Sequence, residues 1–96
     1  MYATIRQYDG ITPADFDTLM SRKADVETLI RDVPGFVQYD LVRTGSGLAS
    51  LTVCKDQAGT EASSTTVANW IKQNLPDLQA NAPKITGGED VLHFSA

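Results

Sequence analysis

The stretch "VPGFVQYDLVRTGSGLASLTVCKD", residues 33–56, contains two runs in which apolar and polar residues alternate. The runs cover residues 37–42 and 49–54, and the glycine-containing connection Thr44–Gly47 separates them. Alternation with a period of two is typical of a β-strand that has one buried face. Two such runs joined by a short glycine-containing segment predict a β-hairpin.

A helix is predicted on each side of this hairpin. In the first, Thr12 can cap the free backbone N–H groups and Pro13 suits the first helical position. This helix must end before Pro34, because proline disfavours helical geometry in the residue that precedes it. The second helix is predicted to begin near residues 56–60 and to end at about Leu75, before another proline.

Two more strands complete the pattern, one over residues 2–8 and one over Val91–Ser95. Residues 76–88, rich in Pro, Asn and Gly, are predicted to form a loop between the second helix and the last strand. The resulting order of strand, helix, strand, strand, helix, strand is the split βαβ, or ferredoxin-like, arrangement. We therefore predict one α+β domain over residues 1–96, in which two helices cover one face of a four-stranded antiparallel sheet.

The sequence also suggests which strand residues face the helices. We assign the more apolar set to the helix-covered face: Ala3, Ile5, Val37, Tyr39, Leu41, Ala49, Leu51, Val53, Leu92 and Phe94. The other face then carries a mixed set: Tyr2, Thr4, Arg6, Tyr8, Phe36, Gln38, Asp40, Val42, Ser50, Thr52 and His93. A mixed face of this kind favours a homodimer packed sheet to sheet about a two-fold axis. A monomer with a partly solvated sheet is the alternative.

Composition excludes several classes of partner and site. The net charge of −4 gives no basic surface for nucleic acid or anionic lipid, and no apolar run is long enough to cross a membrane. The N-terminal residues alternate like a strand and lack the order of a signal peptide, so we expect a cytoplasmic protein. With Cys54 as the only cysteine and His93 as the only histidine, we expect no internal disulfide and no metal centre.

The element order, the chain length, Pro34–Gly35–Phe36 at the start of the second strand and Trp70 in the second helix resemble the antibiotic biosynthesis monooxygenase family. This resemblance implies the dimeric α/β-barrel fold, a homodimer and oxidation of a small aromatic or quinol compound without a cofactor. Haem-degrading members of the superfamily hold iron through a histidine on the second helix. The chain has Trp70 there, and its only histidine lies in the predicted last strand, so a haem cofactor is disfavoured.

Oxidation of an aromatic compound by O₂ without a cofactor requires a phenolate or enolate anion, donors that hold it and exclusion of water. The resemblance points to Trp70 as a pocket wall and to an Asn and a Tyr near the substrate. The candidate catalytic residues are Arg6, Tyr39 and Asn69, and the candidate substrate-binding residues are Trp70, Tyr8 and His93.

Each of these candidates also has a structural interpretation. Trp70 can close the edge of a core, Arg6 can pair with Asp40 across a dimer interface, and His93 can be an interface imidazole. A non-catalytic small-molecule-binding protein and a structural dimerisation domain therefore remain alternatives to an enzyme, and the substrate is not identified.

Lys23 and Glu27 lie within the apolar stripe of the first predicted helix and are four residues apart. They can pair with each other over the rim of the core, with Lys23 extending toward water. Alternatively, they border a cavity between the helices and the sheet. The sequence leaves these two interpretations open.

Overall fold

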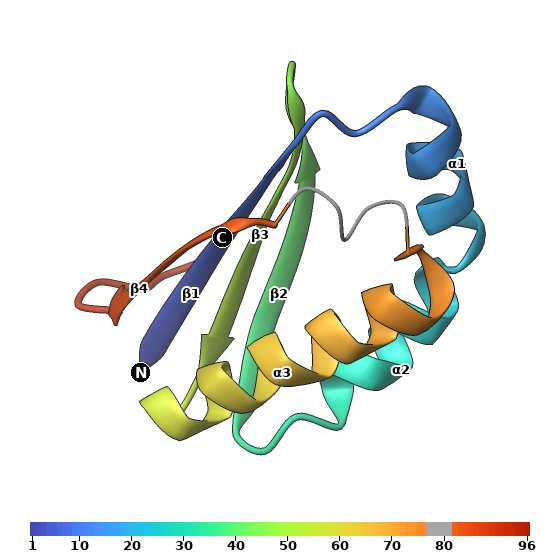
Figure 1. Cartoon of the computed structure of the whole chain (residues 1–96). Helices are drawn as coiled ribbons and strands as arrows, with labels where there is room; N and C mark the ends of the chain where they lie inside the picture. Colours follow the sequence, from blue (N-terminus) through green and yellow to red (C-terminus); the bar gives the residue numbers. More distant parts are fainter. Residues whose placement is uncertain (77–81) are drawn as a thin grey trace.

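In the described part of the chain, a four-stranded antiparallel sheet forms one layer, and three helices lie on one side of it (Figure 1). The computed structural model describes residues 1–76 and 82–96. The strands, in the spatial order β2-β3-β1-β4, are β1 (Tyr2–Asp9), β2 (Phe36–Arg43), β3 (Gly47–Cys54) and β4 (Lys84–Glu89). This arrangement confirms the predicted α+β, ferredoxin-like fold.

The predicted first helix is two helices, α1 (Pro13–Ser21) and α2 (Lys23–Arg31). Between them Arg22 leaves helical geometry, with φ −111° and ψ 13°. The predicted cap is present, because Thr12 Oγ1 accepts a hydrogen bond of 3.1 Å from the backbone N–H of Asp15. The break turns α2 so that it runs beside β2 and shapes the space between them.

The third helix, α3 (Gln57–Asn74), agrees with the predicted second helix. It is capped by Asp56, whose Oδ1 accepts a hydrogen bond of 2.9 Å from the backbone N–H of Gly59. Within the described parts of the chain, every helix is too short or too polar to span a membrane.

The prediction of the last strand was wrong. The fourth strand is Lys84–Glu89, and all but its last residue lie in the stretch predicted as a loop, of which residues 77–81 lie outside the described residues. It pairs with β1 from Tyr2↔Glu89 to Gln7↔Lys84. Hydrogen bonding to the backbone of β1 therefore stabilises a strand whose own residues have low strand propensity. Residues 91–96 form no strand, and Leu92 and Phe94 are 77% and 82% exposed, outside the core.

The assignment of faces was also wrong for β1 and β3. The Arg6 side chain contacts Ser63 and Ser64 on α3, so Arg6 lies on the helix-covered face. Its neighbours on that face, by register and alternation, are Thr4, Tyr8, Leu48, Ser50, Thr52 and Cys54, together with Tyr39 and Leu41 as predicted. The open face carries Ala3, Ile5, Gln7, Gln38, Asp40, Val42, Ala49, Leu51 and Val53. Residues in β1 and β3 alternate between the two faces as predicted. The set that contains Arg6 and the hydroxyl groups around it faces the helices, and the more apolar set lies on the open face.

The space under the helices has an apolar half and a polar half. The buried apolar cluster is formed by Tyr8, Leu19, Leu48 and Leu75. The start of α3 instead covers the sheet with Gly59, Thr60 and Ser63, all of which are buried. A Cβ atom on Gly59 would lie 2.6 Å from the carbonyl oxygen of Pro34 and 2.9 Å from Cys54 Cβ. The absence of a side chain there lets α3 approach the sheet closely and brings its hydroxyl groups to Arg6.

Candidate functional site

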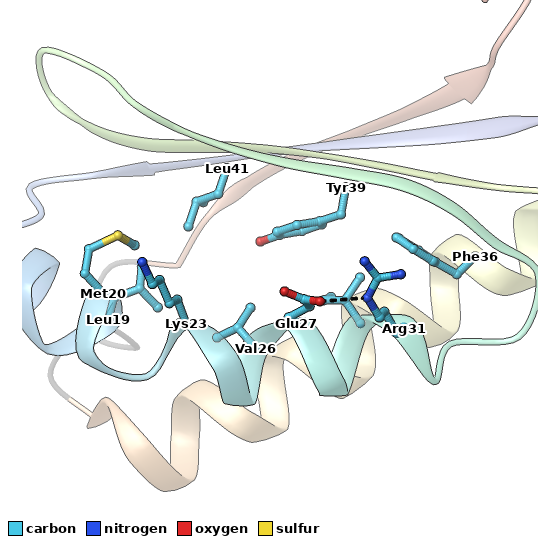
Figure 2. A pocket seen from close by; sticks show the side chains of 10 residues that line it. Leu19, Met20, Lys23, Val26, Glu27, Arg31, Phe36, Tyr39 and Leu41 are labelled. Carbon is cyan, nitrogen blue, oxygen red and sulfur yellow. Dashed lines mark hydrogen bonds and ion pairs between the residues drawn. The ribbon is translucent and has the colours of Figure 1, made fainter.

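A cleft of about 320 Å³ opens between the α1–α2 segment and strand β2 (Figure 2). Its walls are mostly apolar, and its charged groups come from α2. The cleft is lined by Leu19, Met20, Lys23, Val26, Glu27, Ile30, Arg31, Phe36, Tyr39 and Leu41. This is the size and the lining expected of a small-molecule site, in which a few polar groups orient an apolar ligand.

Lys23 and Glu27 both line this cleft, so the cavity interpretation of these two residues holds. They do not pair as predicted, because Glu27 Oε2 accepts a hydrogen bond of 2.9 Å from Arg31 Nε. In Figure 2 the Lys23 amine and the Glu27 carboxylate rise from α2 toward Leu41 and Tyr39 on the strand above them. The cleft therefore offers two cations, Lys23 and Arg31, a carboxylate that pairs with Arg31, and a phenol hydroxyl around one apolar space.

A smaller inner hollow of about 40 Å³ lies behind the cleft. It is lined by Tyr8, Leu19, Val26, Leu29, Tyr39, Leu41, Val67, Trp70, Ile71 and Leu75. Three predicted site residues, Tyr8, Tyr39 and Trp70, thus meet around one space. Because Tyr39 and Leu41 line both the cleft and the inner hollow, the two spaces adjoin at β2.

Trp70 is half-buried and packs against the apolar cluster, in agreement with its structural interpretation. The Arg22 guanidinium lies 5.7 Å from the centre of its ring, a cation–π contact. Arg22 Nη2 also donates to Asn74 Oδ1 at 2.9 Å, and Asn74 Nδ2 donates to the Trp70 carbonyl at 2.9 Å. These contacts fix the end of α3 against the junction of α1 and α2.

The hydroxyl groups of Tyr8 and Tyr39 are protonated at neutral pH. Burial raises the pKa of Tyr39, and the positive charge of Arg6 acts in the opposite direction. Burial likewise raises the pKa of Tyr8, again opposed by Arg6. Each hydroxyl can therefore donate a hydrogen bond to an anion.

Arg6 is the largest fully buried side chain described, with an exposed fraction of 1%. Its guanidinium donates to four hydroxyl groups, on Ser50, Thr52, Ser63 and Ser64. The proposed pair with Asp40 was wrong, because Arg6 faces the helices whereas Asp40 lies on the open face. The hydroxyl groups were missed, although Thr60, Ser63 and Ser64 recur at helical spacing and could have indicated a polar stripe on α3.

Asn69 and His93 do not join the other candidates. Asn69 is exposed on α3 and lines neither the cleft nor the inner hollow. His93 follows β4, where its Nδ1 lies 3.8 Å from Asp90 Oδ2. Across residues 1–76 and 82–96 no group of three His, Cys, Asp or Glu side chains is placed to hold a metal ion.

Comparisons with known proteins identify the fold. No family model matches the sequence, and no curated protein matches it. Among solved structures, the NE2512 protein of unknown function from Nitrosomonas europaea superposes with a TM-score of 0.74 at 18% identity, covering 99% of this chain and 92% of the other. A structure described as antibiotic biosynthesis monooxygenase gives 0.68 at 18% identity, covering 96% and 100%.

A variant of SnoaB, a cofactor-independent oxygenase from Streptomyces nogalater, gives a TM-score of 0.60 at 16% identity, with 99% and 95% of the two chains covered. Identities this low establish a common fold and leave the activity open. Over nearly its whole length, the chain has the fold of the structure described as antibiotic biosynthesis monooxygenase and of the SnoaB oxygenase.

Proposed function

We propose that the protein binds a small phenol or quinol in the cleft between α2 and β2 and oxidises it with O₂, without a cofactor. The observation that carries this proposal is the cleft itself, an apolar space of about 320 Å³ with the Tyr39 hydroxyl, the Lys23 amine and the Glu27 carboxylate at its edges. Its volume lies near the lower end of the range for small-molecule sites, which suits one or two fused rings.

The residues supply the groups that such a reaction needs. The Glu27 carboxylate accepts the proton of the bound substrate, and the Lys23 ammonium pairs with the resulting anion. The protonated Tyr39 hydroxyl donates a hydrogen bond to that anion. The positive charge of Arg6 stabilises the negative charge that this hydrogen bond brings to the Tyr39 oxygen. Tyr8 and Trp70 form the apolar wall behind Tyr39. Asn69 and His93 have no role in this proposal.

The reaction balances without an external reductant when the substrate has a CH₂ group activated by the neighbouring phenol or enol. Removal of a proton gives a carbanion-like enolate, which transfers electrons to O₂ and forms a carbon–oxygen bond. Loss of the second hydrogen and cleavage of the O–O bond give a carbonyl group and one molecule of water. The four electrons that O₂ requires all come from the substrate carbon.

We also propose that the protein is a homodimer formed through the open face of the sheet. Ile5 and Val42 on this face are 44% and 55% exposed, and on β3 between them Leu51 pairs with Ile5 and Ala49 pairs with Val42. A contiguous apolar sheet face is typical of an interface. Native mass spectrometry at low micromolar concentration tests this proposal. A dimer that Val42→Asp converts to a monomer would support it, and a wild-type monomer would refute it.

An oxygen electrode tests the enzymatic proposal, with chelator-treated protein and a panel of naphthoquinols. We expect O₂ consumption above the spontaneous rate with at least one compound. Tyr39→Phe should lower that rate by roughly a hundredfold, the usual effect of removing one donor to an oxyanion. Tyr2→Phe, which changes a tyrosine outside the cleft, is the matched control and should leave the rate unchanged. Tight binding without O₂ consumption would refute the enzymatic proposal and favour a non-catalytic binding protein.

A further inference from the structure

Arg6 is a buried cation surrounded by neutral groups. Its hydrogen-bond acceptors are hydroxyl groups, and among residues 1–76 and 82–96 no carboxylate lies within 4 Å of its guanidinium. Burial lowers the pKa of Arg6, but a guanidinium remains charged at neutral pH. A buried charge without an opposite charge is destabilising, so this position favours the binding of an anion.

The hydrogen bonds of Arg6 indicate where an anion would bind. Nη2 makes one short bond, of 2.7 Å, to Ser63 Oγ, and the other four contacts measure 3.2–3.4 Å. Nε and Nη2 both donate to one oxygen, Ser64 Oγ, at 3.3 and 3.2 Å. These two N–H groups form the fork that binds the two oxygens of a carboxylate in an arginine–carboxylate pair. In this structure a single neutral hydroxyl bridges the fork.

A cavity of about 170 Å³ lies beside this fork. Arg6 and Ser64 both line it, together with Tyr8. The remaining walls are apolar and come from Ala68, Ile71, Ala82, Pro83 and Ile85. The cavity shares no lining residue with the cleft, and it shares Tyr8 and Ile71 with the inner hollow. A ligand that fits here has one anionic end and a small apolar body.

We propose that Arg6 and this cavity form a second binding site, which takes a small monocarboxylic acid with an apolar or aromatic body. The carboxylate displaces the Ser64 hydroxyl and accepts hydrogen bonds from Nε and Nη2. The body of the acid packs between Tyr8 and the α3 residues Ala68 and Ile71. The site does not depend on the oxidation proposed for the cleft.

Benzoate is the probe, and benzamide is its neutral control of the same shape. The readout is the Nε–H signal of Arg6 in the NMR spectrum of the ¹⁵N-labelled full chain, assigned by its absence in Arg6→Met. We expect benzoate, and not benzamide, to shift this signal in a saturable way. Benzoate affinity measured by calorimetry should fall by roughly tenfold or more in Arg6→Met, since a charged hydrogen-bonded pair is lost.

A second variant keeps the test valid if Arg6→Met does not fold. Ala68→Leu extends a side chain from an exposed position on α3 into the cavity and leaves Arg6 intact, so it should abolish benzoate binding while the Arg6 signal persists. Arg43→Met, which removes an exposed arginine outside the cavity, should bind benzoate like the wild type.

An Arg6 signal that benzoate leaves unchanged, or that benzamide shifts equally, would overturn the proposal. So would wild-type binding of benzoate by Ala68→Leu. Asp77 lies outside the described residues, and Asp77→Asn is therefore tested in parallel. If Asp77→Asn binds benzoate and the wild type does not, the chain supplies its own carboxylate and the proposal is also wrong.

Discussion

Gly59→Ala tests how closely α3 approaches the sheet. The added Cβ would lie 2.6 Å from the Pro34 carbonyl oxygen and 2.9 Å from Cys54 Cβ. Both distances are under 3.0 Å, a separation that Cβ atoms in proteins essentially never show. Forcing an extra carbon into a packed site costs about 1–3 kcal/mol. Alanine gains at most about 1 kcal/mol of helix propensity over glycine, so the clash should outweigh it.

We therefore expect Gly59→Ala to lower the free energy of unfolding by about 1–2 kcal/mol and the melting temperature by roughly 5–10 °C. Urea unfolding followed by Trp70 fluorescence and circular dichroism measures the first quantity. Gly45→Ala is the matched control, because nothing lies within 4 Å of its Cβ position, and it should be neutral or slightly stabilising. A Gly59→Ala protein as stable as the wild type would refute the close approach of α3 to the sheet. It would also refute the explanation that this approach brings Ser63 to Arg6.

Three further outcomes are expected. Asp56→Ala removes the side-chain cap of α3 and should cost about 1 kcal/mol in urea unfolding; no loss would mean that the cap is absent in solution. Arg22→Ala removes the cation–π contact with Trp70, so it should shift the Trp70 emission spectrum and cost about 1 kcal/mol, and an unchanged spectrum would count against the contact. Because burial raises the pKa values of Tyr8 and Tyr39, the folded state holds these protons more tightly than the unfolded state. Their contribution to stability is complete below about pH 10, the ordinary tyrosine value, and is lost as the pH rises through the folded pKa values. Alkaline titration of tyrosine absorbance together with unfolding at each pH checks this, and ionisation of both groups at their ordinary pKa would contradict it.

The element order could be predicted because local signals agree with the fold. Thr12 caps the first helix as expected, the next helix starts within the predicted range, after its cap Asp56, and the alternating runs form the hairpin β2–β3. The fourth strand could not be predicted, because its sequence KITGGE has weak strand propensity and forms a strand only through pairing with β1. The apolar alternation at residues 91–95 pairs with none of the four strands described.

The candidate site was harder to predict because tertiary contacts decide which face of each strand packs against the helices. Alternation shows that Ile5 and Arg6 lie on opposite faces, but it does not say which one is buried. Placing the charged residue outside is the usual rule, and here the hydroxyl groups of α3 reverse it. Tyr39 was correctly assigned to the helix side because β2 carries no buried charge on that face. For Lys23 and Glu27 the sequence left the rim of the core and a cavity as alternatives, because the choice depended on the break at Arg22, which sets the course of α2 beside β2.

The central claim is that the cleft beside Tyr39 binds a small aromatic molecule, and an anaerobic NMR titration with a naphthoquinol tests it most directly. Excluding O₂ separates binding from turnover. The account predicts saturable shifts in the backbone signals of Lys23, Glu27, Tyr39 and Leu41, which line the cleft. Tyr39→Phe should weaken these shifts, while Tyr2→Phe should leave them unchanged. Saturable shifts confined to other parts of the chain, or no shifts across the panel of quinols, would contradict it.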